Sequence, residues 1–396
     1  MLARAREVLV LHRVVVVAAI RLKALTALFL ISPHLYVGAA VLPEERADAL
    51  YHNYDGGGIT IDGPSVLVRK NFAEQVSVSA NYYVDSISSA SIDAVTQASP
   101  YKEERTQTSA AIDYLHEKSM LSYSYTYSTE NDYDAETNYI GISQEMFGGL
   151  TTVSLSYTQG DNKVSKTGDD SFSDVASFKN YRTSLAQVLT KKTILSLTYD
   201  LITDEGFLNN PYRQVRYLDS SAARGYSFQA ENYPRTRTSN AASLNLRYHL
   251  PYRAAVFIDY RLFTDSWGIK ADTIEVGYTH PIEENWMFET SVRYYNQNQA
   301  DFYSDLFPFE DAQNYLARDK ELSNFTDYSF NIGVSYTLNN DSLSLFEKAS
   351  ANLYFSHIIF NYDNFRDIRE TSFAAGSEPE YSFSANVIRM YLSFWF

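Results

Sequence analysis

Apolar and small polar residues alternate with a period of two in many segments of the chain. In SMLSYSYTYST, residues 119–129, leucine and tyrosine occupy one set of alternate positions, and serine and threonine occupy the other. The same pattern recurs in LTTVSLSYTQ at 150–159 and in TILSLTYDLI at 193–202. Because successive side chains of a β-strand point to opposite faces, the pattern predicts strands with one apolar face and one small polar face.

Short turns precede seven of the predicted strands and indicate hairpins with about ten residues in each arm. The turn sequences are FAEQ, HEKS, FGGL, TKK, PYR, EEN and NNDSLSLFEK. The opposite connections are long and polar at 86–104, 161–178, 204–235, 299–324 and 362–380, and short at 130–134 and 265–268. The predicted array therefore has short turns at one end and mostly long loops at the other.

The small polar faces distinguish two kinds of all-β protein. A soluble sandwich packs apolar faces around a dry core and places its polar residues outside. A transmembrane barrel turns apolar residues outward to lipid, and it has short periplasmic turns and long outer loops. Rows of Ser and Thr are too small and too polar for a packed core. The sequence therefore predicts an antiparallel up-and-down transmembrane β-barrel in the outer membrane of a Gram-negative bacterium.

The strand number follows from the same pattern. Fifteen strands are counted from Pro64 to Phe396. Bacterial barrels have an even number of strands, so a sixteenth is predicted near Ala47 to Tyr54, with fourteen strands in total as the alternative. A periplasmic or plug segment at 41–63 is the second interpretation of this region.

The first 40 residues differ from the rest of the 396-residue chain. Basic Arg21 and Lys23 precede an apolar stretch that leads to small residues ending at Ala40. This order predicts a signal peptide cleaved near Ala40, with an N-terminal extension before it. A membrane anchor is the alternative, but Arg21 and Lys23 interrupt the roughly 20 apolar residues that an anchor needs.

Composition narrows the classes of function. Tyr, Phe and Trp make up 15% of the residues, which favours β structure. The chain has no cysteine, which excludes disulfides, thiolate metal sites and cysteine nucleophiles. The net charge is -15, and it becomes -19 without residues 1–40, which hold five basic residues and one acidic residue. Binding nucleic acid needs clustered positive charge, so no nucleic-acid partner is expected.

Five stretches of the chain carry a resemblance to a known family. They are ERADALYHNYDGGGITIDGPSVLVRK (45–70), ASPYKEER (98–105), DEGFLNNPYRQVRYLD (204–219), YPRTRTSNA (233–241) and FYSDLFPFEDAQNYLARDKELSNF (302–325). Through them, the chain from about Glu44 to Phe396 resembles an uncharacterised bacterial family, a domain of unknown function predicted to be an outer-membrane β-barrel. The resemblance implies a barrel and no established activity. The long segment before Arg21 departs from the family pattern.

The two longest loops carry opposite charges. Loop 204–235 is rich in arginine, and loop 299–324 is rich in aspartate and glutamate. The residues singled out are Arg213, Arg216, Arg224, Arg235, Asp301, Asp305 and Asp311. One interpretation is that the loops fold inward and oppose these charges across the lumen as a constriction. The other is that the charges pair with each other and hold the loops closed.

Passive passage of small polar or charged solutes, as in a porin, is the function that this pattern favours. The alternative is a non-conducting structural barrel that anchors or displays a periplasmic or surface partner protein. No Ser or Asp motif accompanies the histidines, so no catalytic site is predicted. The acidic clusters at 131–136 and 168–174 lack the ligand order of a calcium loop, so neither a metal site nor a cofactor is predicted. The expected partners are outer-membrane lipid, lipopolysaccharide and the barrel assembly machinery.

The chain ends in the alternating segment RMYLSFWF, residues 389–396. Its apolar face comprises Ile388, Met390, Leu392, Phe394 and Phe396, and the intervening residues form the other face. This alternation predicts the last strand of the barrel. The terminal aromatic residue and the apolar positions before it resemble the signal by which the outer-membrane assembly machinery recognises its clients.

Overall fold

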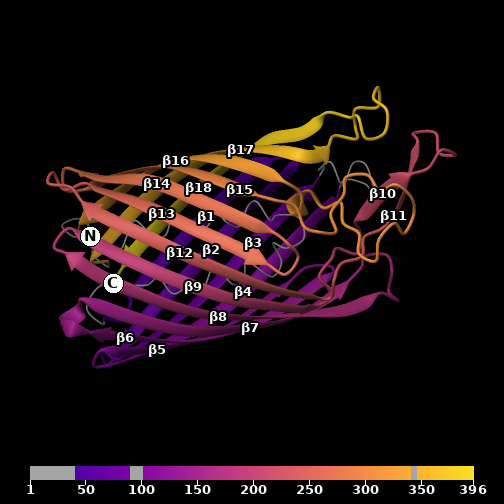
Figure 1. The fold of residues 1–396 in the computed structure, drawn as a ribbon. Coiled ribbons are helices and arrows are strands. Elements are labelled where there is room, and N and C mark those ends of the chain that lie inside the picture. Colours follow the sequence, from indigo (N-terminus) through magenta and orange to yellow (C-terminus); the bar gives the residue numbers. More distant parts are fainter. Residues whose placement is uncertain (1–40, 90–100, 340–345) are drawn as a thin grey trace.

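The computed structural model describes residues 41–89, 101–339 and 346–396. Sixteen antiparallel strands close into one barrel in chain order, and the first strand completes the wall against the last (Figure 1). One further pair, β10 and β11, forms a separate two-stranded sheet between β9 and β12. No helix in the described part of the chain is long and apolar enough to cross a membrane.

The barrel strands are β1 (Arg46–Gly56), β2 (Ile59–Phe72), β3 (Val76–Ser89), β4 (Tyr101–His116), β5 (Ser119–Thr129), β6 (Tyr133–Met146), β7 (Thr151–Ser165), β8 (Ser173–Thr190), β9 (Thr193–Gly206), β12 (Thr236–His249), β13 (Ala255–Asp265), β14 (Lys270–Ile282), β15 (Trp286–Gln297), β16 (Phe325–Asn339), β17 (Lys348–Arg366) and β18 (Glu380–Trp395). The separate sheet consists of β10 (Gln214–Leu218) and β11 (Tyr226–Ala230), and the short helices are η3 (Phe147–Gly149) and η4 (Lys320–Leu322).

The predicted sixteen-stranded antiparallel barrel is confirmed. The sixteenth strand is β1, which contains the segment from Ala47 to Tyr54 that the sequence assigns to it. Both edges of β1 are paired, since Arg46 lies opposite Trp395 of β18 and also opposite Arg69 of β2. Residues 46–56 and 59–72 are thus part of the wall. The predicted signal peptide at 1–40 lies outside the described residues.

The strands are longer than the sequence pattern indicates. β4, β8 and β17 have 16, 18 and 19 residues, whereas about ten residues per hairpin arm were expected from the pattern. Two loops are correspondingly shorter, at 166–172 and 367–379. Backbone N–H and C=O groups pair whatever side chains flank them. The ladder therefore continues beyond the last apolar position, where an apolar alternation gives no signal.

The two ends of the barrel differ as predicted. The short turns lie at the end where Arg46 pairs with Trp395, which we call the short-turn end. The long loops lie at the opposite end, the loop end, where β10 and β11 extend beyond the wall (Figure 1). The turn that the sequence places before β17 includes residues 340–345, which are outside the described residues.

Alternation along each strand separates an outer surface from an inner wall. In β5, Tyr125 exposes 37% of its surface, whereas its neighbour Thr126 is fully buried. In β18, Ile388, Met390 and Leu392 are exposed, and Arg389 between them is buried. The predicted faces of these strands are confirmed, with the apolar face directed outward.

One part of the inner wall is apolar instead of small and polar. The inward positions near the loop end of β1, β2, β16, β17 and β18 carry a buried cluster of Tyr54, Ile59, Ile61, Phe325, Ile358, Phe360, Tyr362, Phe365, Tyr381, Ala385 and Val387. A side chain from a loop lies on this cluster, because the Arg318 guanidinium is 4.4 Å from the centre of the Phe365 ring. The apolar wall therefore supports the loops above it.

Candidate functional site

Three loops combine at the loop end into one assembly. They are the first loop (207–235), the second loop (298–324) and the third loop (367–379), and together we call them the loop assembly. The first loop contains β10 and β11, which pair as a hairpin. The second loop joins this hairpin, because the Phe307 N–H donates to the Arg216 carbonyl and the Leu218 N–H donates to the Phe307 carbonyl, both at 2.9 Å. Backbone hydrogen bonds thus connect segments about 90 residues apart in sequence.

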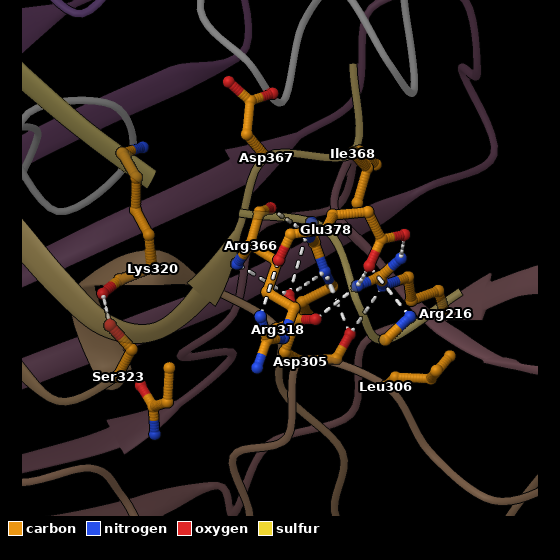
Figure 2. Close-up of polar contacts among 12 residues, drawn as sticks. Arg216, Asp305, Leu306, Arg318, Lys320, Ser323, Arg366, Asp367, Ile368 and Glu378 are labelled. Atoms are coloured by element: carbon orange, nitrogen blue, oxygen red, sulfur yellow. Dashed lines mark hydrogen bonds and ion pairs between the residues drawn. The ribbon is translucent and has the colours of Figure 1, made fainter. Parts of the chain in front are cut away.

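A buried group of charges links all three loops (Figure 2). Arg216 of the first loop donates to both carboxylate oxygens of Glu378 in the third loop, at 2.5 and 3.1 Å. It also forms an ion pair with Asp305 of the second loop and donates from Nε to the Asp305 carbonyl at 2.9 Å. Arg216 and Glu378 are 0% and 1% exposed. The pair therefore has almost no contact with water.

Two further arginines complete this group. Arg318 lies 3.0 Å from Asp305 through its Nη2 atom. Arg366, the last residue of β17, donates from Nη1 to the Glu378 carbonyl at 2.5 Å. We call Arg216, Asp305, Arg318, Arg366 and Glu378 the loop-end ion network. Burial alone would raise the pKa of Glu378, but the hydrogen bonds from Arg216 and its positive charge outweigh burial and lower that pKa.

A second buried acid lies where the first and second loops meet. Glu231 accepts hydrogen bonds from the Tyr233 hydroxyl and from the Arg318 N–H, both at 2.7 Å. Asp319 and Arg213, which form an ion pair with each other, lie close to it. Burial and the negative charge of Asp319 raise the pKa of Glu231 to about 7, against the lowering effect of Arg213.

The structure brings together only some of the loop residues singled out from the sequence. Asp305 meets Arg216, and Arg213 meets Asp319, so the two loops do pair through opposite charges. The other four residues lie outside the loop-end ion network. Arg224 donates to the Ile368 carbonyl, Arg235 pairs with Asp174 of β8, and Asp301 and Asp311 are exposed.

Glu378, Arg318 and Arg366 were not among the predicted site residues. Glu378 belongs to the third loop, and nothing in its local sequence relates it to Arg216, which is 162 residues away. The sequence gives one indirect signal for Glu378. The first loop has more arginines than pair with acids of the second loop, so a further acid from elsewhere is needed. No pattern in the sequence indicates which acid fills that place.

Arginines also lie on the inner wall of the barrel, at inward positions of the strand alternation. Arg182 of β8 faces Asp200 of β9 across the ladder, and its Nε lies 2.6 Å from Oδ1. Arg293 of β15 and Asp327 of β16 are also 2.6 Å apart. Arg261 of β13 is the third member of the group that we call the inner-wall arginines. Their position on the small polar face of each strand could have identified them from sequence.

One histidine has a polar environment that the sequence did not indicate. His52 of β1 lies 2.8 Å from Asp85 of β3, and the Tyr83 hydroxyl lies 3.1 Å from the same ring nitrogen. Arg105 of β4 approaches Asp85 at 3.7 Å. Asp85 lies 33 residues from His52 in sequence, so no local motif indicates this contact. All four side chains are buried, and a buried polar cluster of this kind fixes neighbouring strands by satisfying hydrogen bonds.

A group of three carboxylates occurs at the loop end. Glu103, Glu130 and Asp132 offer oxygen atoms within 4.8 Å of one another. Carboxylate oxygens are ligands that hard cations prefer. Asp132 also accepts a hydrogen bond from the Tyr212 hydroxyl at 2.7 Å, which links this group to the first loop.

Comparison with known families identifies the group to which this barrel is related. Residues 95–350 match the model of a family described as "Protein of unknown function (DUF3570)". The chain belongs to this family. The resemblance seen in the sequence is thereby confirmed. No curated protein matches this DUF3570 member.

Solved structures similar to this DUF3570 member are outer-membrane barrels. A bacterial polysaccharide outer membrane secretin has a TM-score of 0.46 and 7% identity, over 90% of this chain and 100% of that chain. The CymD monoaromatic hydrocarbon channel has a TM-score of 0.42 and 11% identity, over 90% and 89%. The outer membrane protein OpdK from Pseudomonas aeruginosa has a TM-score of 0.41 and 11% identity, over 88% and 99%.

Proposed function

We propose that this DUF3570 member is an integral outer-membrane channel for passive passage of small polar or charged solutes, that it has no catalytic activity, and that the loop assembly narrows its outer mouth. The observation that carries this proposal is the chemistry of the inner wall. Small polar residues and charged side chains face inward over most of the barrel, while apolar side chains face outward. The apolar outer surface can contact lipid, and the polar inner wall can form hydrogen bonds with hydrated solutes.

The loop-end ion network supports a narrowed mouth. Its charges come from three loops that leave the barrel at different strands, so their pairing holds these loops together at the loop end. A buried ion pair is costly to break, because the remaining charge is left without a partner. The loops should therefore stay together unless a partner of the network is removed.

Conductance of the purified protein in a planar bilayer tests this function. We expect a small steady current from the unaltered protein and a larger one from Arg216→Ala, which leaves Glu378 and Asp305 without their shared partner. Arg369→Ala is the matched control, because Arg369 pairs with Asp367 in the same third loop but at its exposed surface. Equal currents from Arg216→Ala and Arg369→Ala would show that the loop-end ion network does not narrow the outer mouth.

A non-conducting barrel that anchors or displays a partner protein is the second candidate function. The feature that favours it is the tight linkage of the loop assembly, in which backbone and charged contacts both join the loops. The same measurement separates the candidates. Absence of current from both the unaltered protein and Arg216→Ala would contradict the channel, and co-purification of a stoichiometric partner would then support the anchor.

A further inference from the structure

Arg261 has unusual surroundings on the inner wall. It lies opposite Ser243 of β12 and Thr273 of β14, and both of these neighbours are small. Its guanidinium lies 5.5 Å from the centre of the Phe263 ring, two residues along the same strand. Neither of the two paired neighbours carries a charge, and the ring covers one side of the guanidinium.

Arg182 and Arg293 differ from Arg261 because each of them already binds a carboxylate. Arg182 is paired with Asp200 and Arg293 with Asp327. Among the residues that the structure describes, no ion pair joins Arg261 to a carboxylate. Arg261 is nevertheless close enough to Asp200, Arg182 and Arg293 to interact with them electrostatically.

The charged side chains that act on Arg261 are mostly positive. The guanidinium groups of Arg182 and Arg293 repel its charge, and the carboxylate of Asp200 attracts it. Asp200 and Asp327 are also the ion-pair partners of Arg182 and Arg293, so neither carboxylate belongs to Arg261 alone. An anion that passes along the wall would meet at this position a guanidinium group that holds no carboxylate of its own.

We propose that Arg261 is an anion-binding site of the lumen and takes a small carboxylate or phosphate anion. The planar guanidinium presents paired N–H donors that match both oxygens of such a group. The inference rests on the proposed channel function, because it assigns the class of solute that the inner wall attracts. Cations would be repelled at the same position.

Selectivity measurements test the site directly. Reversal potentials are measured across a planar bilayer under gradients of potassium chloride, potassium acetate and potassium phosphate. We expect Arg261→Gln to lower the ratio of anion to cation permeability roughly 1.5- to 5-fold, the size of a solvent-accessible ion pair. Arg261→Lys should keep most of the chloride permeability and should lose more of the acetate and phosphate permeability. Lysine retains the positive charge but lacks the paired N–H donors of the guanidinium.

Arg247→Gln is the matched control for net charge. Arg247 is also an inward arginine over an aromatic ring, with its guanidinium 5.2 Å from the centre of Phe257. It differs in having Asp259, Glu289 and Glu275 as acidic neighbours. If Arg261→Gln and Arg247→Gln change selectivity equally, the effect belongs to total charge and the Arg261 site is refuted.

A second measurement does not depend on conduction. Thermal unfolding of the detergent-purified protein is followed with acetate, phosphate or chloride at equal ionic strength. A ligand that binds the folded state raises the midpoint, so acetate or phosphate should raise it for the unaltered protein and not for Arg261→Gln. A barrel without current that still shows this shift would refute the channel and keep the site. A conducting barrel with no shift and unchanged selectivity in Arg261→Gln would refute the site alone.

Discussion

The loop-end ion network and the inner wall use the same residue types under different conditions. Arg216 and Glu378 expose 0% and 1% of their side chains, whereas Arg182 exposes 32% and Asp200 exposes 5%. The first pair joins distant loops, and the second joins neighbouring strands. Breaking a buried pair costs about 3–5 kcal/mol, and a pair in contact with water contributes at most about 1 kcal/mol. Burial therefore makes the Arg216–Glu378 pair a structural link, whereas the Arg182–Asp200 pair remains able to exchange partners with a passing ion.

The largest effect should come from removing Arg216. Arg216→Ala leaves Glu378 buried without its ion-pair partner, while Asp305 keeps Arg318. We therefore expect the loop assembly to lose about 3–5 kcal/mol of stability. Hydrogen exchange of loop amides in the purified barrel measures this loss. Arg369→Ala, at an exposed pair in the same loop, should change it by less than about 1 kcal/mol. Similar losses of stability in both variants would show that burial does not distinguish the two ion pairs.

The next effect concerns pH at Glu231. Its folded-state pKa is raised from 4.5 to about 7, so the loop assembly binds a proton that the open loops release. Stability is therefore greatest below about pH 4.5 and falls as pH rises towards 7, by up to about 3 kcal/mol. Hydrogen exchange of the loops between pH 5 and 8, corrected for intrinsic rates, checks this direction. Glu231→Gln should flatten the dependence, and an unchanged dependence in that variant would assign it to another group.

A smaller effect is expected on the inner wall. Arg182→Gln frees Asp200 and should shift permeability towards cations, whereas Asp200→Asn frees Arg182 and should shift it towards anions. Each shift should be roughly 1.5- to 5-fold. Reversal potentials in potassium chloride measure both shifts. The double variant should have nearly the ion selectivity of the unaltered protein. Shifts in the same direction would show that this pair acts through packing and not through its charges.

The smallest expected structural effect lies outside both regions, at the C-terminus. Deleting Phe396 removes a ring that lies 5.1 Å from the Lys70 ammonium, but it leaves the pairing of β18 intact. We expect lower outer-membrane levels with little change in the stability of the assembled barrel. Quantitative immunoblotting of membrane fractions, with Phe396→Tyr as control, measures this. Normal levels without Phe396 would count against an assembly signal.

The sequence predicted the barrel well because the wall depends on a local rule. Side chains alternate between faces, so the adjacent positions of Tyr125 and Thr126 predict that they face opposite sides of the wall. Strand ends were less predictable, since backbone pairing persists where outward residues become polar. The apolar inner wall around Phe360 also escaped prediction, because apolar residues on both faces of a strand remove the alternation.

The candidate site was predictable only in part. The opposite charges of the first two loops were visible in composition, and Arg216 and Asp305 do meet. The sequence left open whether these charges pair or oppose each other across the lumen, and the choice of Asp305 over Asp301 or Asp311 has no local signal. Glu378 belongs to the third loop, in which no residue was singled out from the sequence.

The sequence by itself determined the strands, their faces, their number and the contrast between the two ends of the barrel. These properties follow from backbone geometry and from side-chain alternation within a few residues. The tertiary structure decided which charges are buried together and which remain open. Closing the barrel brings loops more than 100 residues apart into contact, as for Arg216 and Glu378, while it leaves Arg261 on the inner wall between two arginines that already have partners.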